Sequence, residues 1–175
     1  MEFNELISAR RSVRGYKAGI EHDALVSILK TAQQAPSWKN QQTARCYAVE
    51  TPEILEDLRT AALPSFNQNS SANAALIVTT FVRDVSGFGD GTAVNEAGNN
   101  WGAYDLGLHD AYLVLAARNA GYDTLIMGIR DGEAIRRKLG IPENEIIMSV
   151  IAIGVRSAEP AVKPRKDFEE VVRFF

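Results

Sequence analysis

The stretch from Tyr104 to Ala120 constrains the possible folds more than any other part of the chain. Its apolar residues, Leu106, Leu108 and most of residues 111–117, leave little polar surface around the helical circumference. A helix of this kind must be buried. The chain has 175 residues, the size of one domain with one sizeable core. We therefore predict a single domain, residues 1–175, in which this helix also forms a subunit interface.

Apolar runs predict the strands. Ala74–Val82 and Ile146–Val155 are continuous and rich in β-branched residues, which is typical of strands covered on both faces. Arg45–Glu50 alternates as a strand does, and Leu125–Met127 is a shorter apolar segment. None of these runs approaches the ~20 residues that a membrane-spanning helix needs.

Polar caps and apolar residues at three-to-four spacing predict the remaining helices. They are expected at residues 4–9, from an Asp23 cap to Pro36, from Thr51–Pro52 to about Ala62, and from an Asp131 cap through Leu139 to a stop at Gly140.

Two segments lack a regular pattern. Pro64–Asn73 is polar and irregular, and residues 84–100 contain Gly87, Gly89 and Gly91 with few apolar side chains. We predict a long mobile loop over 84–100, of the kind that often covers an active site. No helix pattern opens directly after these glycines, so they do not form a dinucleotide-binding loop.

Residues 158–175 are predicted to form an extended arm. The segment starts with prolines and basic residues and ends in the apolar residues Phe168, Val171, Val172, Phe174 and Phe175. Such an end needs a surface to dock on, and in a homodimer the partner subunit provides one.

Composition excludes several classes of function. Hydrophobic residues make up 46% and charged residues 23% of the chain, and the net charge of -3 repels nucleic acid and anionic membranes. Cys46 is the only cysteine, which excludes a disulfide framework and fits a reducing cytoplasm. The charged residues 1–14 do not resemble a secretory signal. We expect a cytoplasmic protein that binds no nucleic acid and no membrane.

Metal and hydrolase sites are also not expected. His22 and His109 lack the spacing of a zinc motif, and Cys46 lies within an apolar strand pattern, where a core position is more common than a nucleophile.

Two basic groups lie near opposite ends of the chain. Arg10, Arg11, Ser12 and Arg14 place three guanidinium groups and a hydroxyl within five positions, which suits phosphate recognition. The Lys163-Pro164-Arg165 segment sends two cations to the same side of an extended backbone. A solvated surface run and a basic tail are the alternatives.

Two other segments offer contacts for a flat ligand. Ala35–Gln42 combines a proline with hydroxyl, amide and indole groups, which provide the donors and acceptors that the pyrimidine edge of a flavin requires. The alternative is an ordinary helix-to-strand loop. Gly128 follows an apolar run at Met127 and would let the backbone approach a ring closely.

The order of these segments resembles the nitroreductase family of flavoproteins over essentially the full length. Residues 10–14 are similar to the family's Arg-x-Ser-x-Arg/Lys segment, which contacts the phosphate, ribityl chain and pyrimidine oxygen of FMN. Residues 35–42 are similar to its Ala-Pro-Ser-x-x-Asn-x-Gln segment beside the flavin. Lys163 and Arg165 match a C-terminal phosphate-binding pair, and Met127–Gly128 match a position where the backbone meets the ring.

The resemblance implies a set of FMN-binding residues. They are Arg10, Arg11, Ser12, Arg14, Pro36, Ser37, Trp38, Asn40, Asn67, Met127, Gly128, Lys163 and Arg165. For Asn67, a neighbouring amide is the alternative.

The resemblance also implies an α+β sandwich, in which helices flank a mainly antiparallel sheet, and a homodimer with FMN at the subunit interface. The implied activity passes hydride from NAD(P)H through FMN to a small acceptor such as a nitroaromatic or a quinone. Arg14 would then stabilise negative charge at the N1/C2=O edge of the flavin. Departures from the family pattern at Trp38, Thr43–Ala44 and Met127 concern the acceptor and not the cofactor.

Two other functions remain open. The protein could bind FMN without turnover, as a store or a sensor, with Trp38 and the Gly-rich loop closing the face that NAD(P)H would use. It could also fragment its own flavin or dehalogenate an aromatic substrate, because the same fold serves different chemistries.

Overall fold

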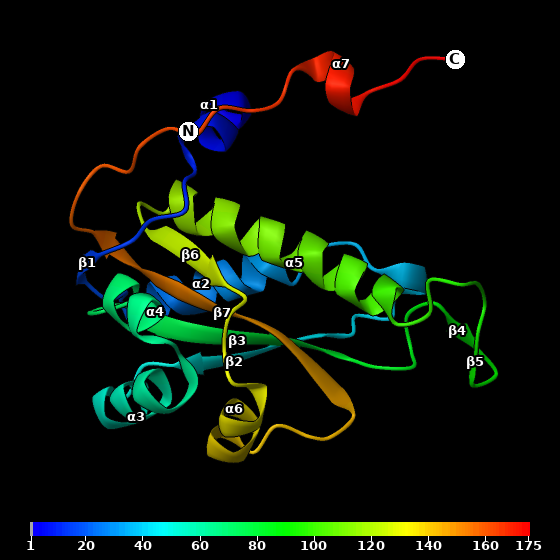
Figure 1. The fold of residues 1–175 in the computed structure, drawn as a ribbon, viewed down its shortest axis with the longest axis horizontal. Helices are drawn as coiled ribbons and strands as arrows, with labels where there is room; N and C mark the ends of the chain where they lie inside the picture. Colours follow the sequence, from blue (N-terminus) through cyan, green and yellow to red (C-terminus); the bar gives the residue numbers. More distant parts are fainter. Residues whose placement is uncertain (1) are drawn as a thin grey trace.

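The computed structural model describes residues 2–175. Its main sheet contains β1 (Tyr16–Ala18), β2 (Ala44–Val49), β3 (Ala75–Val82), β6 (Asp123–Met127) and β7 (Glu145–Arg156). β1, β3 and β6 all pair with β7, and β2 extends the sheet beyond β3 (Figure 1). All of these strand pairs are antiparallel.

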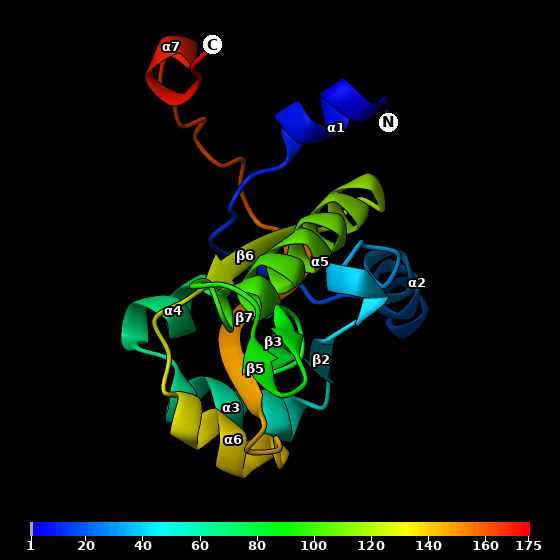
Figure 2. The same cartoon turned by 90° about the vertical axis from the view of Figure 1, so that its right-hand side faces the viewer.

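Helices cover both faces of this sheet. α2 (His22–Ala32) and α5 (Asn100–Asn119) pack on one face, and α3 (Pro52–Ala62) and α6 (Gly132–Leu139) pack on the other (Figures 1 and 2). The predicted α+β sandwich with a mainly antiparallel sheet is confirmed.

Shorter elements complete the chain. They are α1 (Phe3–Ala9), the 3₁₀ turn η1 (Trp38–Asn40), α4 (Ser65–Ser70), the hairpin strands β4 (Phe88–Gly89) and β5 (Thr92–Ala93), and α7 (Phe168–Val171).

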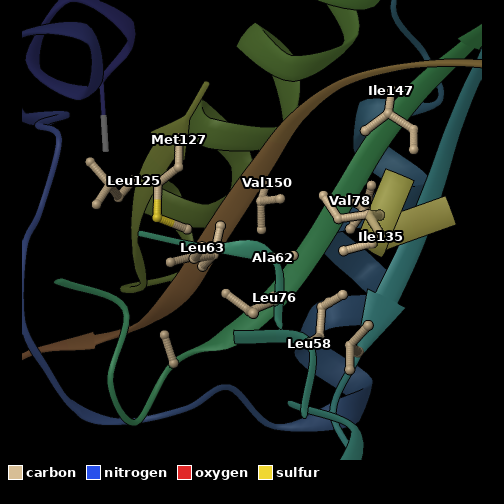
Figure 3. Packing of buried hydrophobic residues seen from close by; sticks show 14 of the residues in the cluster. Leu58, Ala62, Leu63, Leu76, Val78, Leu125, Met127, Ile135, Ile147 and Val150 are labelled. Carbon is tan, nitrogen blue, oxygen red and sulfur yellow. The ribbon is translucent and has the colours of Figure 1, made fainter. Parts of the chain in front are cut away.

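Strand β3 explains why the molecule has two hydrophobic clusters. Ala75 and Ile77 face α2 and α5, whereas Leu76 and Val78 face α3 and α6, because successive side chains of a strand point to opposite faces. All four are at most 5% exposed. The cluster on the α3 and α6 side is shown from close by in Figure 3. The continuous apolar run predicted this double burial correctly.

Local capping forms α6 as predicted. The Asp131 carboxylate accepts the Ala134 N–H at 2.9 Å, and Gly140 ends the helix with a φ of 63°, a conformation that glycine adopts at little cost. The prediction for α3 is also confirmed, with Pro52 as its first residue.

Two predictions about helices were wrong. Glu21, not Asp23, is the N-cap of α2, and it makes no side-chain capping bond. The segment from Pro64 to Asn73 contains α4. This helix is held by tertiary contacts, since Asn67 Nδ2 donates to the Ile129 carbonyl at 2.9 Å.

The Gly-rich segment is more regular than predicted. It contains the β4–β5 hairpin, and α5 begins at Asn100, one turn before Tyr104. Side-chain bonds organise this region: Asn99 Nδ2 donates to Asp84 Oδ1 at 2.8 Å, and Trp101 Nε1 donates to Asn95 Oδ1 at 3.0 Å. An apolar periodicity pattern does not register such polar contacts.

Within one chain, α5 is buried on one side only. Leu106, Leu113 and Ala117 are at most 2% exposed, whereas Tyr104 and Tyr112 on the opposite side are 60% and 41% exposed. The complete burial predicted from the sequence is therefore not reached in a single chain.

The C-terminal arm leaves the sheet after β7. It passes to the side of the molecule where α1 lies and ends in α7 (Figures 1 and 2). The large apolar residues near its end are exposed: Phe168, Val171, Phe174 and Phe175.

Candidate functional site

The basic segment 10–14 is attached to the outer edge of β6. Ser12 forms a parallel β-bridge with Thr124, and the Val13 N–H donates to the Thr124 carbonyl at 2.9 Å. The Val13 side chain is 1% exposed, while Ser12 and Arg14 on either side of it are exposed. Alternation along an extended backbone thus directs the polar side chains outward.

Tyr16 strengthens this attachment. Its hydroxyl donates to the Val13 carbonyl at 3.0 Å. Burial, with a smaller contribution from the Asp123 charge, raises the pKa of Tyr16. The hydroxyl therefore keeps its proton and remains a hydrogen-bond donor.

A cavity of about 630 Å³ lies between the basic segment and the C-terminal arm. Its lining brings together the two basic groups from opposite ends of the chain: Arg10, Arg11, Ser12 and Arg14 from the first, and Lys163 and Arg165 from the second. Apolar side chains, including Ile7 and Val162, complete the wall.

Among the described residues, none of the cations that line this cavity has an acidic partner. Within residues 2–175, Arg10, Arg14, Lys163 and Arg165 form no ion pair. Arg11 has a different role, because its Nη1 donates to backbone carbonyls at the end of α1. Unpaired cations that converge on one cavity, in a chain of net charge -3, fit an anion with several oxygens such as a phosphate.

The segment 35–42 forms a tight turn near the N-terminus of α5. Lys39, Asn40 and Gln42 have positive φ angles of 46°, 57° and 51°, which are uncommon outside glycine and persist where the surroundings hold them. The Gln42 N–H donates to Ser37 Oγ at 2.9 Å and closes the turn.

A second cavity, of about 410 Å³, lies beside this turn. Pro36 and Ser37 line it, together with Asp105 and His109 of α5. Trp38 packs instead against Trp101 of α5, with ring centroids 4.7 Å apart. Its Nε1 is buried and has no hydrogen-bond partner among the described residues.

Asn67, Met127 and Gly128 lie together at the C-terminal end of β6. The Met127 side chain points into the core and is 3% exposed (Figure 3). Gly128 is exposed. The Asn67 side-chain amide donates to the carbonyl of Ile129, the residue that follows Gly128. At this end of β6, the Gly128 backbone and the Ile129 side chain are exposed and can meet a ligand, whereas the Met127 side chain cannot.

The predicted site residues thus form two groups. In one group, residues 10–14 run beside β6 and share a cavity with residues 163 and 165, while residues 67 and 127–128 lie at the C-terminal end of β6. The other group is the turn with Pro36, Ser37, Trp38 and Asn40. Figure 1 shows the turn, in light blue, near the N-terminal end of α5, whereas α1 and the arm lie toward its C-terminal end. A single chain does not bring the two groups into one cavity.

The sequence matches the model of the nitroreductase family over residues 7–155. The chain belongs to the nitroreductase family. The matched region contains residues 10–14 and the 35–42 turn and ends just before the C-terminal arm.

Individual relatives agree with this membership. A curated relative from Archaeoglobus fulgidus, which carries the name of an NADH dehydrogenase/NAD(P)H nitroreductase, is 30% identical over 95% of this chain and 88% of its own length. A nitroreductase family protein from Clostridium novyi is 27% identical, with a TM-score of 0.75, over 89% of this chain and 87% of that chain. A nitroreductase from Exiguobacterium sibiricum in complex with FMN has the same fold, with a TM-score of 0.84 and 21% identity over 100% and 98% of the two chains.

The structure of this nitroreductase-family chain also reveals polar residues that sequence analysis missed. Asp105 is 4% exposed within α5 and accepts hydrogen bonds from the Trp38 N–H and the Ser86 hydroxyl. A carboxylate inside a nearly apolar helix was the available clue.

Within residues 2–175, no helix has both the length and the apolar character needed to cross a membrane.

Proposed function

We propose that this nitroreductase-family protein is a cytoplasmic, FMN-dependent NAD(P)H oxidoreductase that reduces a small acceptor such as a nitroaromatic or a quinone. The cavity between the two chain ends carries the proposal. Its unpaired cations come from segments that are far apart in the sequence, so a shared ligand with a terminal phosphate explains why both segments are basic. The FMN complex of the Exiguobacterium sibiricum protein supports the same cofactor.

Each side-chain group has a role in this proposal. Arg10, Lys163 and Arg165 would hold the phosphate of FMN, and Arg14, which lines the same cavity, would place positive charge at the N1/C2=O edge of the ring. When bound, FMN would take up hydride from NAD(P)H and pass it to the acceptor. The exposed backbone at Gly128 and the Asn67 amide, which is fixed by Ile129, would border the ring.

We further propose that the enzyme is a homodimer. The turn at Pro36–Asn40 lies away from the basic cavity in one chain, so a second copy is needed to place such a turn beside it. The outer side of α5, with Tyr104 and Tyr112, and the apolar end of the arm offer exposed surface for this contact. FMN would then lie at the subunit interface.

An absorbance spectrum and a reduction test examine the proposal directly. The purified protein should be yellow and should release FMN and not FAD. NAD(P)H should bleach the colour without oxygen, and a quinone or nitroaromatic should restore it, with ping-pong kinetics. A colourless protein that cannot be reconstituted with FMN would contradict the proposal.

The second candidate is an FMN store or sensor without turnover. The packing of Trp38 against Trp101, beside the hairpin, favours this candidate, because the aromatic pair would cover the flavin face that NAD(P)H would use. A yellow protein that NAD(P)H does not bleach under anaerobic conditions would support this candidate instead.

A further inference from the structure

Asp105 is a buried carboxylate that joins three elements. It belongs to α5, and its Oδ2 accepts the Trp38 N–H at 2.9 Å and the Ser86 hydroxyl at 2.7 Å. Ser86 precedes the β4–β5 hairpin, and its Oγ also lies 3.3 Å from the Thr43 hydroxyl. One side chain therefore connects α5, the 35–42 turn and the base of the hairpin.

The same three elements meet a second time at Trp101. Its ring packs against Trp38, and its Nε1 donates to Asn95 Oδ1 at 3.0 Å. Gly87 lies directly against the ring, because a Cβ at this position would be 2.5 Å from Trp101 Cδ1. The hairpin and the turn are thus packed together around the first turn of α5.

The turn needs such support. Its three positive-φ residues, Lys39, Asn40 and Gln42, occupy a backbone region that side chains disfavour, so the conformation depends on contacts that hold it. The bond from the Trp38 N–H to Asp105 and the packing of Trp38 against Trp101 tie this turn to α5, a long helix that is buried on one side.

We propose that Asp105 is a positioning residue: by fixing the Trp38 turn and the hairpin as one unit, it sets the shape of the surface where the electron acceptor meets the flavin. The inference rests on the proposed function, because the turn is taken to border the flavin. Asp105 acts through Trp38 and Ser86 and is not itself in contact with the reacting atoms.

Three variants test this inference in the full-length, flavin-loaded protein. Asp105→Leu removes both bonds that Asp105 accepts, and Asp105→Asn keeps an oxygen that can accept them. Ser86→Ala removes the contacts of the Ser86 hydroxyl with Asp105 and Thr43 and leaves the Trp38 bond in place. We expect Asp105→Leu to raise the KM for the acceptor about tenfold, the loss associated with a hydrogen bond to a charged group, with little change in kcat. Asp105→Asn should keep the KM close to that of the wild type. Ser86→Ala is the milder change, and it tests the inference if Asp105→Leu does not fold.

Tryptophan fluorescence provides a readout that does not require turnover. The chain has two tryptophans, Trp38 and Trp101, and both belong to this cluster. Acrylamide should quench them more strongly in Asp105→Leu than in the wild type. Asp110→Leu is the matched control, since Asp110 is also buried in α5 but bonds to Thr79 and His109. It should lower stability without changing the quenching or the KM.

The outcomes separate this inference from the proposed function. Wild-type quenching and KM in folded Asp105→Leu and Ser86→Ala would overturn the inference, as would a lower kcat at unchanged KM in both Asp105→Leu and Asp110→Leu. A wild-type protein that reduces no acceptor would overturn the proposed function. In that case the change in quenching is still expected, because it depends only on the Asp105 bonds.

Discussion

Cys46 Sγ lies 3.8 Å from His109 Nε2, and His109 Nδ1 lies 3.2 Å from Asp110 Oδ1. This order of groups resembles that of an activated thiol nucleophile. The surroundings of this thiol nevertheless disfavour the thiolate form. Burial makes the larger contribution and the negative charge of Asp110 the smaller one, and together they raise the pKa of Cys46 to about 12. A thiol with such a pKa remains protonated at neutral pH and reacts slowly.

We expect Cys46 in the folded protein to resist a thiol reagent such as Ellman's reagent at pH 8, and to react fully once the chain is unfolded in guanidinium. Its pKa is raised from an ordinary value of 9.0 to about 12. The contribution of this protonated thiol to stability is therefore present below pH 9 and is lost as the pH rises toward 12. Rapid stoichiometric labelling of the native protein at pH 8 would contradict the assignment.

The Asp131 cap gives a stability prediction. Asp131→Ala leaves the Ala134 N–H without its acceptor and should lower the free energy of unfolding by about 1 kcal/mol. Asp131→Asn is the control, because its side-chain oxygen can still cap the helix. Chemical denaturation measures both, and equal losses in the two variants would show that the cap is not the cause.

The elements that sequence predicted well depend on local information. The double burial of β3 follows from a continuous apolar run, and the ends of α6 follow from Asp131 and Gly140. α4 was missed because a contact distant in sequence holds it, that of Asn67 with Ile129. The hairpin was missed because polar side-chain bonds, such as that of Trp101 with Asn95, leave no apolar pattern in the sequence.

The candidate site, like the fold, was predicted from the sequence only in part. The basic residues were found from composition and resemblance, but only the folded chain shows that residues 10–14 and the 163–165 segment share a cavity. Asp105 was overlooked because a count of apolar residues ignores a buried acid, and its partners, Trp38 and Ser86, come from two other segments.

The exposed side of α5 predicts the effect of a charge at Tyr112. This side chain is 41% exposed on a largely apolar surface, so Tyr112→Glu should leave the fold intact and dissociate the proposed homodimer, because an unpaired charge at an interface core is costly. Analytical ultracentrifugation at micromolar concentration would measure the change.

Ile54→Glu is a suitable control for the dimer experiment. Ile54 lies on α3, on the other side of the sheet, and is 47% exposed. This variant should remain dimeric. A wild-type protein that is a flavin-loaded monomer at micromolar concentration would contradict the homodimer.

The last prediction concerns Arg165 in the basic cavity. Hydrogen bonds to charged groups contribute roughly 1.5 to 3 kcal/mol each, so Arg165→Ala should weaken FMN binding by about one to two orders of magnitude. The protein should still fold, because the arm is exposed. Riboflavin lacks the phosphate, and its affinity should hardly change. Titration of the flavin-free protein with each ligand gives the two dissociation constants.

A neighbouring lysine controls for loss of charge on the arm. Lys166 does not line the cavity, and its Nζ lies 4.0 Å from Glu170 Oε2. Lys166→Ala should therefore leave the affinity for FMN near that of the wild type. Equal weakening of FMN and riboflavin by Arg165→Ala would show that Arg165 acts through the arm or the interface and not through the phosphate. Equal effects of the two variants on FMN would show that general positive charge, and not a specific contact, attracts the ligand.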